Sequence, residues 1–331
     1  MTKNLNEKNI KQIPASQLRS EDEIISSWKG DVDKPLVSIN CITYNHASYI
    51  EDALIGFLRQ ETDFPIEILV HDDASTDGTA DIIRKYEALY PKLIKPIYQS
   101  ENQYSKGFRL MPYNARRALG TYIAMCEGDD YWTDASKLNK QVTFLENNRE
   151  YVISGHDAVI LSEEGKLKSN IYLPSKMKRN FSGEELMRGE ASLPTASWLY
   201  RNILNENIWE RKRVKNGDLF FISLIGQYGC SRFHNDIKPS IYRVHKGGVW
   251  SRANSKERMK SLANTFFWMS LYYSRVGDFQ MSEFYYSKFL RKNLNAVPFR
   301  VIVEEFLRRI VFFEKLKRFI RFFTSRLFRG I

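Results

Sequence analysis

Short apolar runs alternate with amphipathic stretches along the chain after residue 35. Runs at 36–42, 66–71, 93–99 and 121–126 have the length of buried strands. The stretches between them carry apolar residues at i, i+3 and i+4 spacing, which predicts helices. This strand–helix alternation predicts an α/β fold in which a mostly parallel sheet is flanked by helices on both faces.

A polar cluster follows three of these predicted strands. The clusters are TYNH at 43–46, HDDASTDGT at 71–79 and EGDDYW at 127–132. Ligands of parallel α/β sheets bind just beyond the carboxyl ends of the strands. The three clusters are therefore expected to converge on one ligand-binding crevice.

The rest of the chain has less regular patterns. Beyond residue 134 we predict helices at 136–148 and 217–229, strands at 151–161, 194–201 and 237–245, and a hairpin at 163–174. From residue 255 two helical stretches predict a helical hairpin, because Gly277 between them supplies a turn.

These patterns divide the chain into three parts. Residues 1–34 form a polar lead-in with one short helix, which the capping-box spacing of Ser20 and Glu23 predicts. Residues 35–254 form the α/β domain, and residues 255–331 form an all-helical extension.

Three acids crowd the end of the fourth predicted strand, namely Glu127, Asp129 and Asp130. Carboxylates this close repel one another unless a cation offsets their charge. Mg²⁺ and Mn²⁺ take oxygen ligands, usually one or two carboxylates together with phosphate oxygens. The cluster therefore predicts a site for Mg²⁺ or Mn²⁺. The structural alternative is a solvated acidic turn before the helix that begins near Ala135.

Two further acids, Asp72 and Asp73, end the second predicted strand. Acids in this place can accept hydrogen bonds from a ribose hydroxyl or from a base N–H. The structural alternative is an Asx-turn and a helix N-cap made by Ser75 or Asp77. That alternative explains the turn better than it explains two adjacent acids, so we predict that Asp72 or Asp73 contacts a ligand.

The segment from Pro35 to Ile83, followed by GTYIAMCEGDDYWTD at 120–134, resembles the family 2 glycosyltransferases of the GT-A fold. The resemblance has specific motifs over residues 35–161 and continues more loosely beyond them. It implies a Rossmann-like GT-A domain, with a nucleotide-sugar half at 35–134 and an acceptor half at 135–254.

The resemblance also implies which residues bind the donor. In this family the turn after the first strand and the acids of the second strand bind the nucleoside. The corresponding residues here are Thr43, Tyr44, Asn45, Asp72 and Asp73. The family's D-x-D element binds the metal and the donor diphosphate, and it reads E-G-D in this chain. The implied metal ligands are Asp129, Asp130, Glu127 (through water) and His245.

A general base and an acceptor side follow from the same resemblance. Asp218 opens a predicted helix, where the structural alternative is an N-cap. In the family, an acid at this place takes the proton of the acceptor hydroxyl during a one-step displacement that inverts the sugar configuration. Thr195 and Ser197 are candidates for the acceptor side, although strand hydroxyls often only bond locally.

The stretch YRVHKGGVWS carries the last implied site residues. In relatives this stretch closes over the diphosphate, which implies Arg243, Lys246 and Trp250 as diphosphate or lid residues. The structural alternatives are an exposed strand end and a buried tryptophan.

Basic and apolar residues alternate at helical spacing near the C-terminus. Residues 299–331 contain nine Lys or Arg and three Glu, so they carry over half of the formal net charge of +11. A basic amphipathic helix rich in Phe suits the interface of an anionic bilayer. We therefore predict that this helix associates with a membrane surface. The alternative is packing against the helical hairpin or a dimer partner.

Together these features predict a metal-dependent, inverting glycosyltransferase of hexosyltransferase type. The expected donor is a nucleotide-diphosphate sugar, and a UDP-sugar is the first candidate. The expected acceptor is a glycan or a lipid-linked precursor of cell-surface polysaccharide. The polar N-terminus lacks the apolar run of a signal peptide, and the three cysteines lack metal-type spacing. The expected location is therefore cytoplasmic and peripheral, at the inner face of the cell membrane.

Two alternative functions remain at this stage. A nucleotidyltransferase uses a similar sheet and a metal, but it usually carries a glycine-rich and basic loop after the first strand, which TYNHASYI lacks. A non-catalytic protein that binds nucleic acid or membrane would place basic and aromatic residues where this sequence places acids. No nucleic-acid partner is expected.

Overall fold

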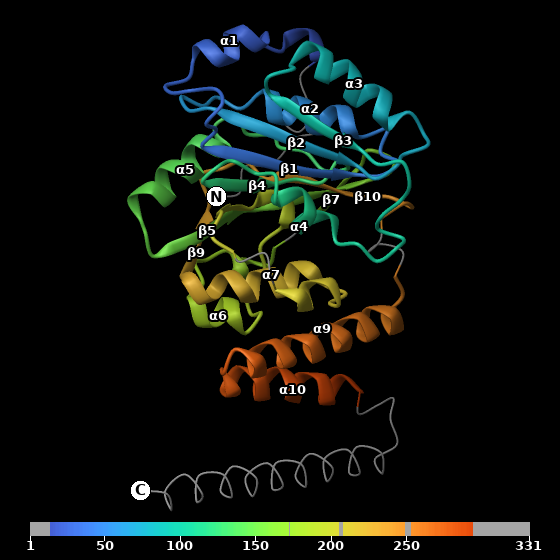
Figure 1. Ribbon diagram of the computed structural model, residues 1–331, viewed down its shortest axis with the longest axis vertical. Coiled ribbons are helices and arrows are strands. Elements are labelled where there is room, and N and C mark those ends of the chain that lie inside the picture. The colour runs from blue at the N-terminus through green and yellow to red at the C-terminus, as the bar shows by residue number, and fades with distance from the viewer. Residues whose placement is uncertain (1–13, 172, 205–207, 249–252, 294–331) are drawn as a thin grey trace, which may run out of the picture. The chain divides into compact units, whose positions relative to one another are not determined.

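The computed structural model describes residues 14–171, 173–204, 208–248 and 253–293 (Figure 1). The chain divides into two units, Met1–Asn254 and Ser255–Ile331. The larger unit contains the α/β sheet, and the smaller one is helical where the structure describes it.

A seven-stranded sheet forms the centre of the larger unit, in the order β3-β2-β1-β4-β8-β5-β9. β8 is antiparallel to both of its neighbours, and the other neighbouring strands are parallel. The bounds are β1 Val37–Thr43, β2 Ile66–Asp72, β3 Ile94–Tyr98, β4 Tyr122–Met125, β5 Tyr151–His156, β8 Leu199–Arg201 and β9 Cys230–His234. The predicted mostly parallel α/β architecture is therefore confirmed.

Helices cover both faces of this sheet (Figure 1). One face is covered by α1 Glu21–Ser26, α2 Ile50–Leu58, α3 Thr79–Leu89 and α5 Lys137–Asn147. The other face is covered by α4 Leu110–Ala115, α6 Gly183–Met187 and α7 Gly217–Ile225. Along β4 the side chains alternate, since Tyr122 and Ala124 join the first core while Ile123 and Met125 join the second.

The lead-in packs on the sheet. The capping box predicted for α1 is present, because the Ser20 side chain accepts from the Glu23 N–H while the Glu23 carboxylate accepts from the Ser20 N–H. Ile24 in this helix is buried within the same core as β1 and β2. The short helix was therefore predicted correctly, and it belongs to the hydrophobic core of the larger unit.

A second, three-stranded sheet lies in the acceptor half, in the order β10-β6-β7. Its strands are β6 Ala158–Ser162, β7 Leu167–Ile171 and β10 Ser240–Val244. The single strand predicted at 151–161 was wrong, because β5 and β6 belong to different sheets. The break falls at Asp157, whose carboxylate accepts from the Ala158 N–H and pairs with Lys178 at 2.5 Å.

Other differences from the predicted elements are local. The strand predicted at 194–201 begins with one 3₁₀ turn, Thr195–Ser197, and becomes β8 only at Leu199. β9 and α6 were not predicted. Further 3₁₀ turns are Ala15–Gln17, Ser175–Met177, Trp209–Lys212 and Gly226–Tyr228.

The described part of the smaller unit is a helical hairpin, as predicted. It consists of α9 Ser255–Arg275 and α10 Phe279–Asn293, joined through Gly277 with φ +86°. No helix in the described ranges is long and apolar enough to cross a membrane. The basic amphipathic helix predicted at 299–331 lies outside the described residues.

Candidate active site

The strand order places a ligand site at the carboxyl ends of β1 and β4. From β1 the chain proceeds outward through β2 and β3 and then returns to β4 on the other side of β1. Such a reversal is where open α/β sheets bind ligands. The loop after β1 carries His46, the loop after β4 carries Asp129, and the end of β10 leads to His245.

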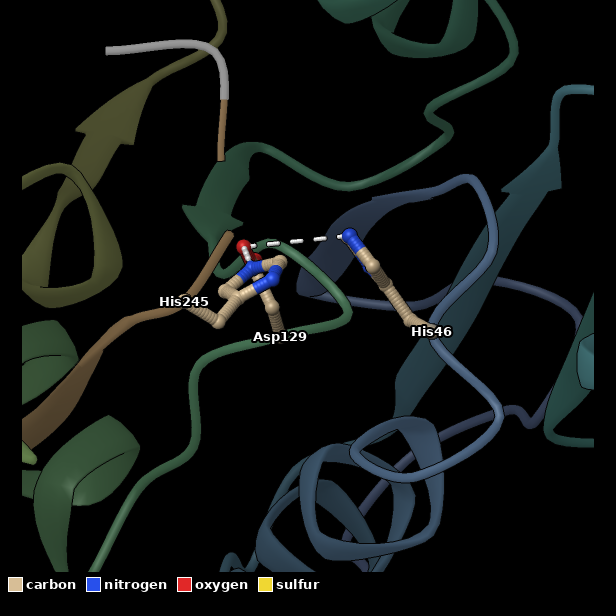
Figure 2. Close-up of side chains that lie close together, drawn as sticks. All are labelled: His46, Asp129 and His245. Atoms are coloured by element: carbon tan, nitrogen blue, oxygen red, sulfur yellow. Dashed lines mark hydrogen bonds and ion pairs between the residues drawn. The ribbon is translucent and has the colours of Figure 1, made fainter. Parts of the chain in front are cut away.

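These three side chains form a compact cluster, and Figure 2 shows both imidazoles directed toward the Asp129 carboxylate. Asp129 Oδ2 lies 3.0 Å from Nε2 of His245 and 3.8 Å from Nε2 of His46. One ligand atom from each residue lies within 4.8 Å of the others. The Tyr49 ring packs against His245, with 4.9 Å between ring centroids.

Burial and charge set the protonation of the cluster. Burial lowers the pKa of His46, and Asp129 opposes this only in part, so His46 is neutral near neutral pH. Burial acts to raise the pKa of Asp129, but the hydrogen bond from His245 and the two nearby imidazoles outweigh it and lower that pKa. His245 Nδ1 accepts from the Gly247 N–H at 3.2 Å, which assigns the proton of the neutral ring to Nε2.

The cluster fits a divalent cation. Asp129 Oδ1 and His46 Nδ1 are buried and find no hydrogen-bond partner among the described residues. Ligands about 2.1 Å from one ion lie about 3.0 Å apart at right angles and about 4.2 Å apart in line. The separations in the cluster are close to this range, so an ion between the side chains requires small shifts of these groups. It also requires the His245 proton to move from Nε2 to Nδ1, which frees Nε2 as a ligand and releases the Gly247 N–H. A carboxylate with two imidazoles suits a transition metal such as Mn²⁺.

The other two acids of this loop do not join the cluster. Asp130 is buried, and its Oδ1 accepts from the backbone N–H of Arg243 at 2.9 Å. Burial and the nearby Asp129 charge raise the pKa of Asp130 well above its ordinary value. Glu127 is exposed, and partial loss of hydration, Asp129 and Asp218 raise its pKa. Within the described residues, the predicted metal ligands that join the cluster are Asp129 and His245.

The residues expected to bind the nucleoside lie after β1 and at the end of β2, and hydrogen bonds join these two loops. Asn45, with φ +54°, accepts from the Thr76 N–H at 2.8 Å and donates its own N–H to the Ser75 hydroxyl at 2.8 Å. Asp72 accepts from the backbone N–H and the hydroxyl of Ser75. The Asx-turn alternative therefore describes the contacts of Asp72 in this structure.

Three other implied nucleoside residues differ in what they contact. Both carboxylate oxygens of Asp73 accept backbone N–H groups, from Gln103 at 2.7 Å and Tyr104 at 3.0 Å. The Thr43 hydroxyl is buried without a hydrogen-bond partner in the part of the chain that the structure describes. The Tyr44 side chain is 43% exposed. The Thr43 hydroxyl and the Tyr44 ring are thus left to meet a ligand.

On the acceptor side, Asp218 lies in the first turn of α7. It is exposed, partial loss of hydration raises its pKa, and its charge in turn raises the pKa of Glu127. The Ser197 hydroxyl is buried and donates to the Pro194 carbonyl at 2.7 Å, whereas Thr195 is half-buried.

The implied lid residues are only partly described. Lys246 is exposed directly after His245, and Trp250 lies outside the described residues. The Arg243 side chain is largely buried, and its guanidinium donates to the Asp129 carbonyl and pairs with Asp52.

Sequence reasoning missed His46 and Asp52. His46 stands in the first polar cluster, and its position directly after β1 was the available signal. Asp52 is in the first turn of α2, where an acid is ordinary at a helix N-terminus, so nothing in the local sequence singled it out.

Position 128, between Glu127 and Asp129 in the sequence, requires glycine because Thr43 and Ile50 pack closely against its backbone. A Cβ at this position would lie 2.7 Å from Thr43 Oγ1 and 2.9 Å from Ile50 Cδ1. We expect Gly128→Ala to destabilise the protein by about 1–3 kcal/mol, since both neighbours are buried and cannot yield freely. Thermal unfolding measures the effect. Gly217→Ala is the matched stability control, because a Cβ there meets nothing within 4 Å. Equal melting temperatures for the two variants would contradict the packing argument.

The mostly parallel sheet flanked by helices defines a GT-A-type fold, and comparison with known proteins gives the family. Residues 38–209, more than half of the chain, match the model of glycosyl transferase family 2. The chain belongs to this family.

The chain is also similar to individual curated proteins. The Mycobacterium tuberculosis protein Rv1520 is 40% identical over 232 residues, which cover 67% of this chain and 62% of that protein. The chain thus spans less than two thirds of this relative's length. The Escherichia coli UDP-Glc:alpha-D-GlcNAc-diphosphoundecaprenol beta-1,3-glucosyltransferase WfaP is 37% identical over 117 residues, or 35% of this chain and 43% of WfaP.

A solved structure supports the fold alone. Staphylococcus aureus TarS residues 1–349, crystallised with UDP-GlcNAc, superposes with a TM-score of 0.54 at 17% identity. The superposition covers 78% of this chain and 73% of that one.

Proposed function

We propose that the protein is a metal-dependent, inverting glycosyltransferase. It would move a sugar from a nucleotide-diphosphate donor to an acceptor hydroxyl. The observation that carries the proposal is the cluster of His46, Asp129 and His245 at the carboxyl ends of β1 and β4 in a family 2 chain.

The proposed mechanism assigns each group one task. Asp129, His245 and His46 would hold the cation, which supplies positive charge to the departing diphosphate. Asp218 would take the proton of the acceptor hydroxyl as that oxygen forms a bond to the anomeric carbon. The bond from this carbon to the diphosphate oxygen breaks on the opposite face, so the configuration inverts.

Contacts to the donor are proposed for residues with groups free to make them. The Thr43 hydroxyl, which has no hydrogen-bond partner among the described residues, and the exposed Tyr44 ring are proposed to contact the nucleoside. Lys246, exposed next to His245, is proposed to contact the diphosphate. Trp250, in the same stretch of sequence, is proposed to cover the sugar.

A UDP-sugar donor and a lipid-linked acceptor are the proposed substrates. The name of WfaP states a UDP-glucose donor and a diphosphoundecaprenol-linked acceptor. A lipid-linked acceptor lies at a membrane, and the basic segment 299–331 would attract anionic lipid. We therefore propose a peripheral, cytoplasmic-face location. Liposome flotation of a chain truncated after Pro298 tests it, and undiminished binding would contradict it.

The test of the proposed function is a panel of nucleotide sugars assayed for hydrolysis and binding with and without metal. We expect one UDP-sugar to be hydrolysed only when a divalent cation is present. Mn²⁺ should act at lower concentration than Mg²⁺, because two imidazoles favour a transition metal over Mg²⁺. Turnover that survives a chelator would contradict metal dependence, and a panel without any bound nucleotide sugar would contradict the function.

A further inference from the structure

Arg243 joins three parts of the site through one side chain. Its Nη1 donates to the Asp129 carbonyl at 2.9 Å, and its Nη2 pairs with the Asp52 carboxylate of α2. Its guanidinium carbon lies 5.0 Å from the centroid of the Tyr49 ring and 4.7 Å from that of Tyr131. The side chain is only 10% exposed. The protein itself therefore supplies the guanidinium with two polar contacts and two aromatic neighbours.

The backbone of Arg243 is attached to the same loop. Its N–H donates to Asp130 Oδ1 at 2.9 Å. One residue thereby contacts Asp129 through its side chain and Asp130 through its main chain. Two positions further along, His245 contributes its imidazole to the cluster, so the placement of Arg243 also sets the placement of His245.

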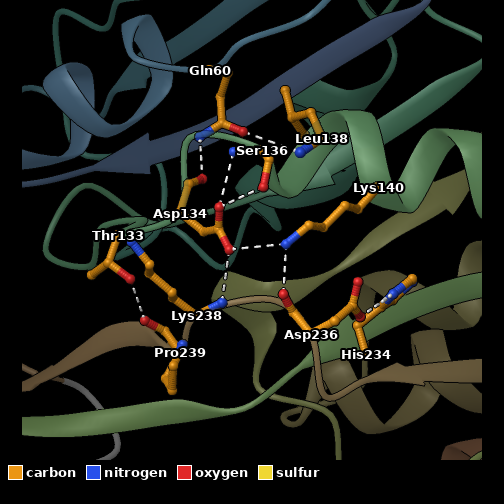
Figure 3. Close-up of polar contacts among 10 residues, drawn as sticks. All are labelled: Gln60, Thr133, Asp134, Ser136, Leu138, Lys140, His234, Asp236, Lys238 and Pro239. Atoms are coloured by element: carbon orange, nitrogen blue, oxygen red, sulfur yellow. Dashed lines mark hydrogen bonds and ion pairs between the residues drawn. The ribbon is translucent and has the colours of Figure 1, made fainter. Parts of the chain in front are cut away.

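The contacts of Arg243 lie at one end of a longer series of hydrogen bonds between residues 129–134 and residues 238–245. Tyr131 and Ile241 exchange both backbone hydrogen bonds, at 3.3 and 2.8 Å. At the far end, which Figure 3 shows, Thr133 donates to the Pro239 carbonyl at 2.7 Å. Asp134 accepts there from the Lys238 N–H at 2.9 Å. The loop that carries Asp129 is therefore fastened to β10 along its length.

Charge explains why Asp52 is needed. A guanidinium next to Asp129 and Asp130 would otherwise be drawn to their carboxylates, where it would compete with a cation. Asp52 pairs with the guanidinium from the opposite element and leaves the Asp129 carboxylate to the two histidines. Lysine could not replace Arg243, because an ammonium lacks the planar fork that reaches the Asp52 carboxylate and the Asp129 carbonyl together while lying over two aromatic rings.

We propose that Asp52 and Arg243 are positioning residues that hold Asp129 and His245 in the geometry for binding a cation. Arg243 then acts through these contacts and not by binding the donor diphosphate. This inference rests on the proposed function, since it takes the cluster to be the metal site.

The test is Mn²⁺ binding to the full chain without donor, measured by electron paramagnetic resonance for the wild type, Arg243→Lys and Asp52→Asn. We expect the Kd for Mn²⁺ to rise about 10- to 100-fold in both variants, as is usual when partners of metal ligands are removed. Glu51→Gln is the matched control, because Glu51 is the neighbouring acid of α2 and contacts Lys85 and Tyr86 instead. Its Kd should equal that of the wild type. Asp52→Glu keeps the charge and should restore part of the affinity.

The outcomes separate the alternatives. An unchanged Kd for Mn²⁺ in both variants, with a raised KM for the donor in Arg243→Lys, would make Arg243 a diphosphate ligand and overturn the proposal. Unchanged values of both constants would overturn it as well. A wild-type chain that binds no Mn²⁺ would refute the metal site of the proposed function, and the positioning role with it. If Arg243→Lys fails to fold, Asp52→Asn alone decides.

Discussion

Replacing Asp129 with asparagine is expected to abolish metal-dependent transfer while the fold persists. The amide has the shape of the carboxylate but lacks the charge that a cation requires. The Asp129 carbonyl still accepts from Arg243, so the loop keeps its attachment to β10. A metal contributes several kcal/mol to stabilising a leaving diphosphate, which corresponds to a loss of about a thousand-fold in kcat or more.

The rate of sugar transfer at saturating donor and Mn²⁺ measures this loss. Asp81→Asn is the control, because Asp81 is exposed on α3 and pairs only with the nearby Arg84 at 2.8 Å in the described contacts. Transfer by Asp129→Asn at the wild-type rate, with the same dependence on Mn²⁺, would remove Asp129 from the metal site.

Replacing Asp218 with asparagine is expected to leave donor binding intact and to reduce transfer about 10²- to 10⁴-fold, the usual contribution of a general base. The amide cannot take a proton from the acceptor hydroxyl. Calorimetric binding of UDP measures the first quantity, and single-turnover transfer measures the second. A variant that transfers sugar as fast as the wild type would exclude Asp218 as the base.

The pH dependence of transfer gives a second view of Asp218. Partial loss of hydration raises its pKa, so the carboxylate takes up a proton at higher pH than an ordinary aspartate, for which the pKa is about 3.9. The protonated acid cannot act as a base. Wild-type transfer should therefore fall as the pH drops through this raised pKa, and the residual transfer of Asp218→Asn should lack that decline.

Much of the fold was predictable because its signals are local. Length and periodicity identified β1 to β4, α2 and α3, and the capping box identified α1. The unpredicted α6 carries the same capping-box signal, in Ser182 and Glu185, although its helix is short. The separation of β5 from β6 was missed because residues 151–161 were interpreted as one strand, although the apolar run pauses at 154–157. The contacts of the Asp157 side chain show the break.

The site was predictable in its location and less so in the roles of its residues. Position at the carboxyl end of β4 was enough to single out the acids. The strand β10 decides which acid faces the histidines, because the Arg243 N–H donates to the Asp130 carboxylate. This strand lies more than a hundred residues after the acids, so their local sequence does not show the difference. The roles proposed for His46 and Asp52 depend on contacts with Asp129 and Arg243, which are distant in the sequence.

The coordination of Mn²⁺ in the wild-type chain with UDP bound, measured by pulsed electron paramagnetic resonance, tests the proposed metal site most directly. We expect one Mn²⁺ per chain with couplings to two imidazole nitrogens, one lost in His46→Gln and the other in His245→Gln. Mn²⁺ bound without any nitrogen coupling, or with couplings that survive both substitutions, would contradict it.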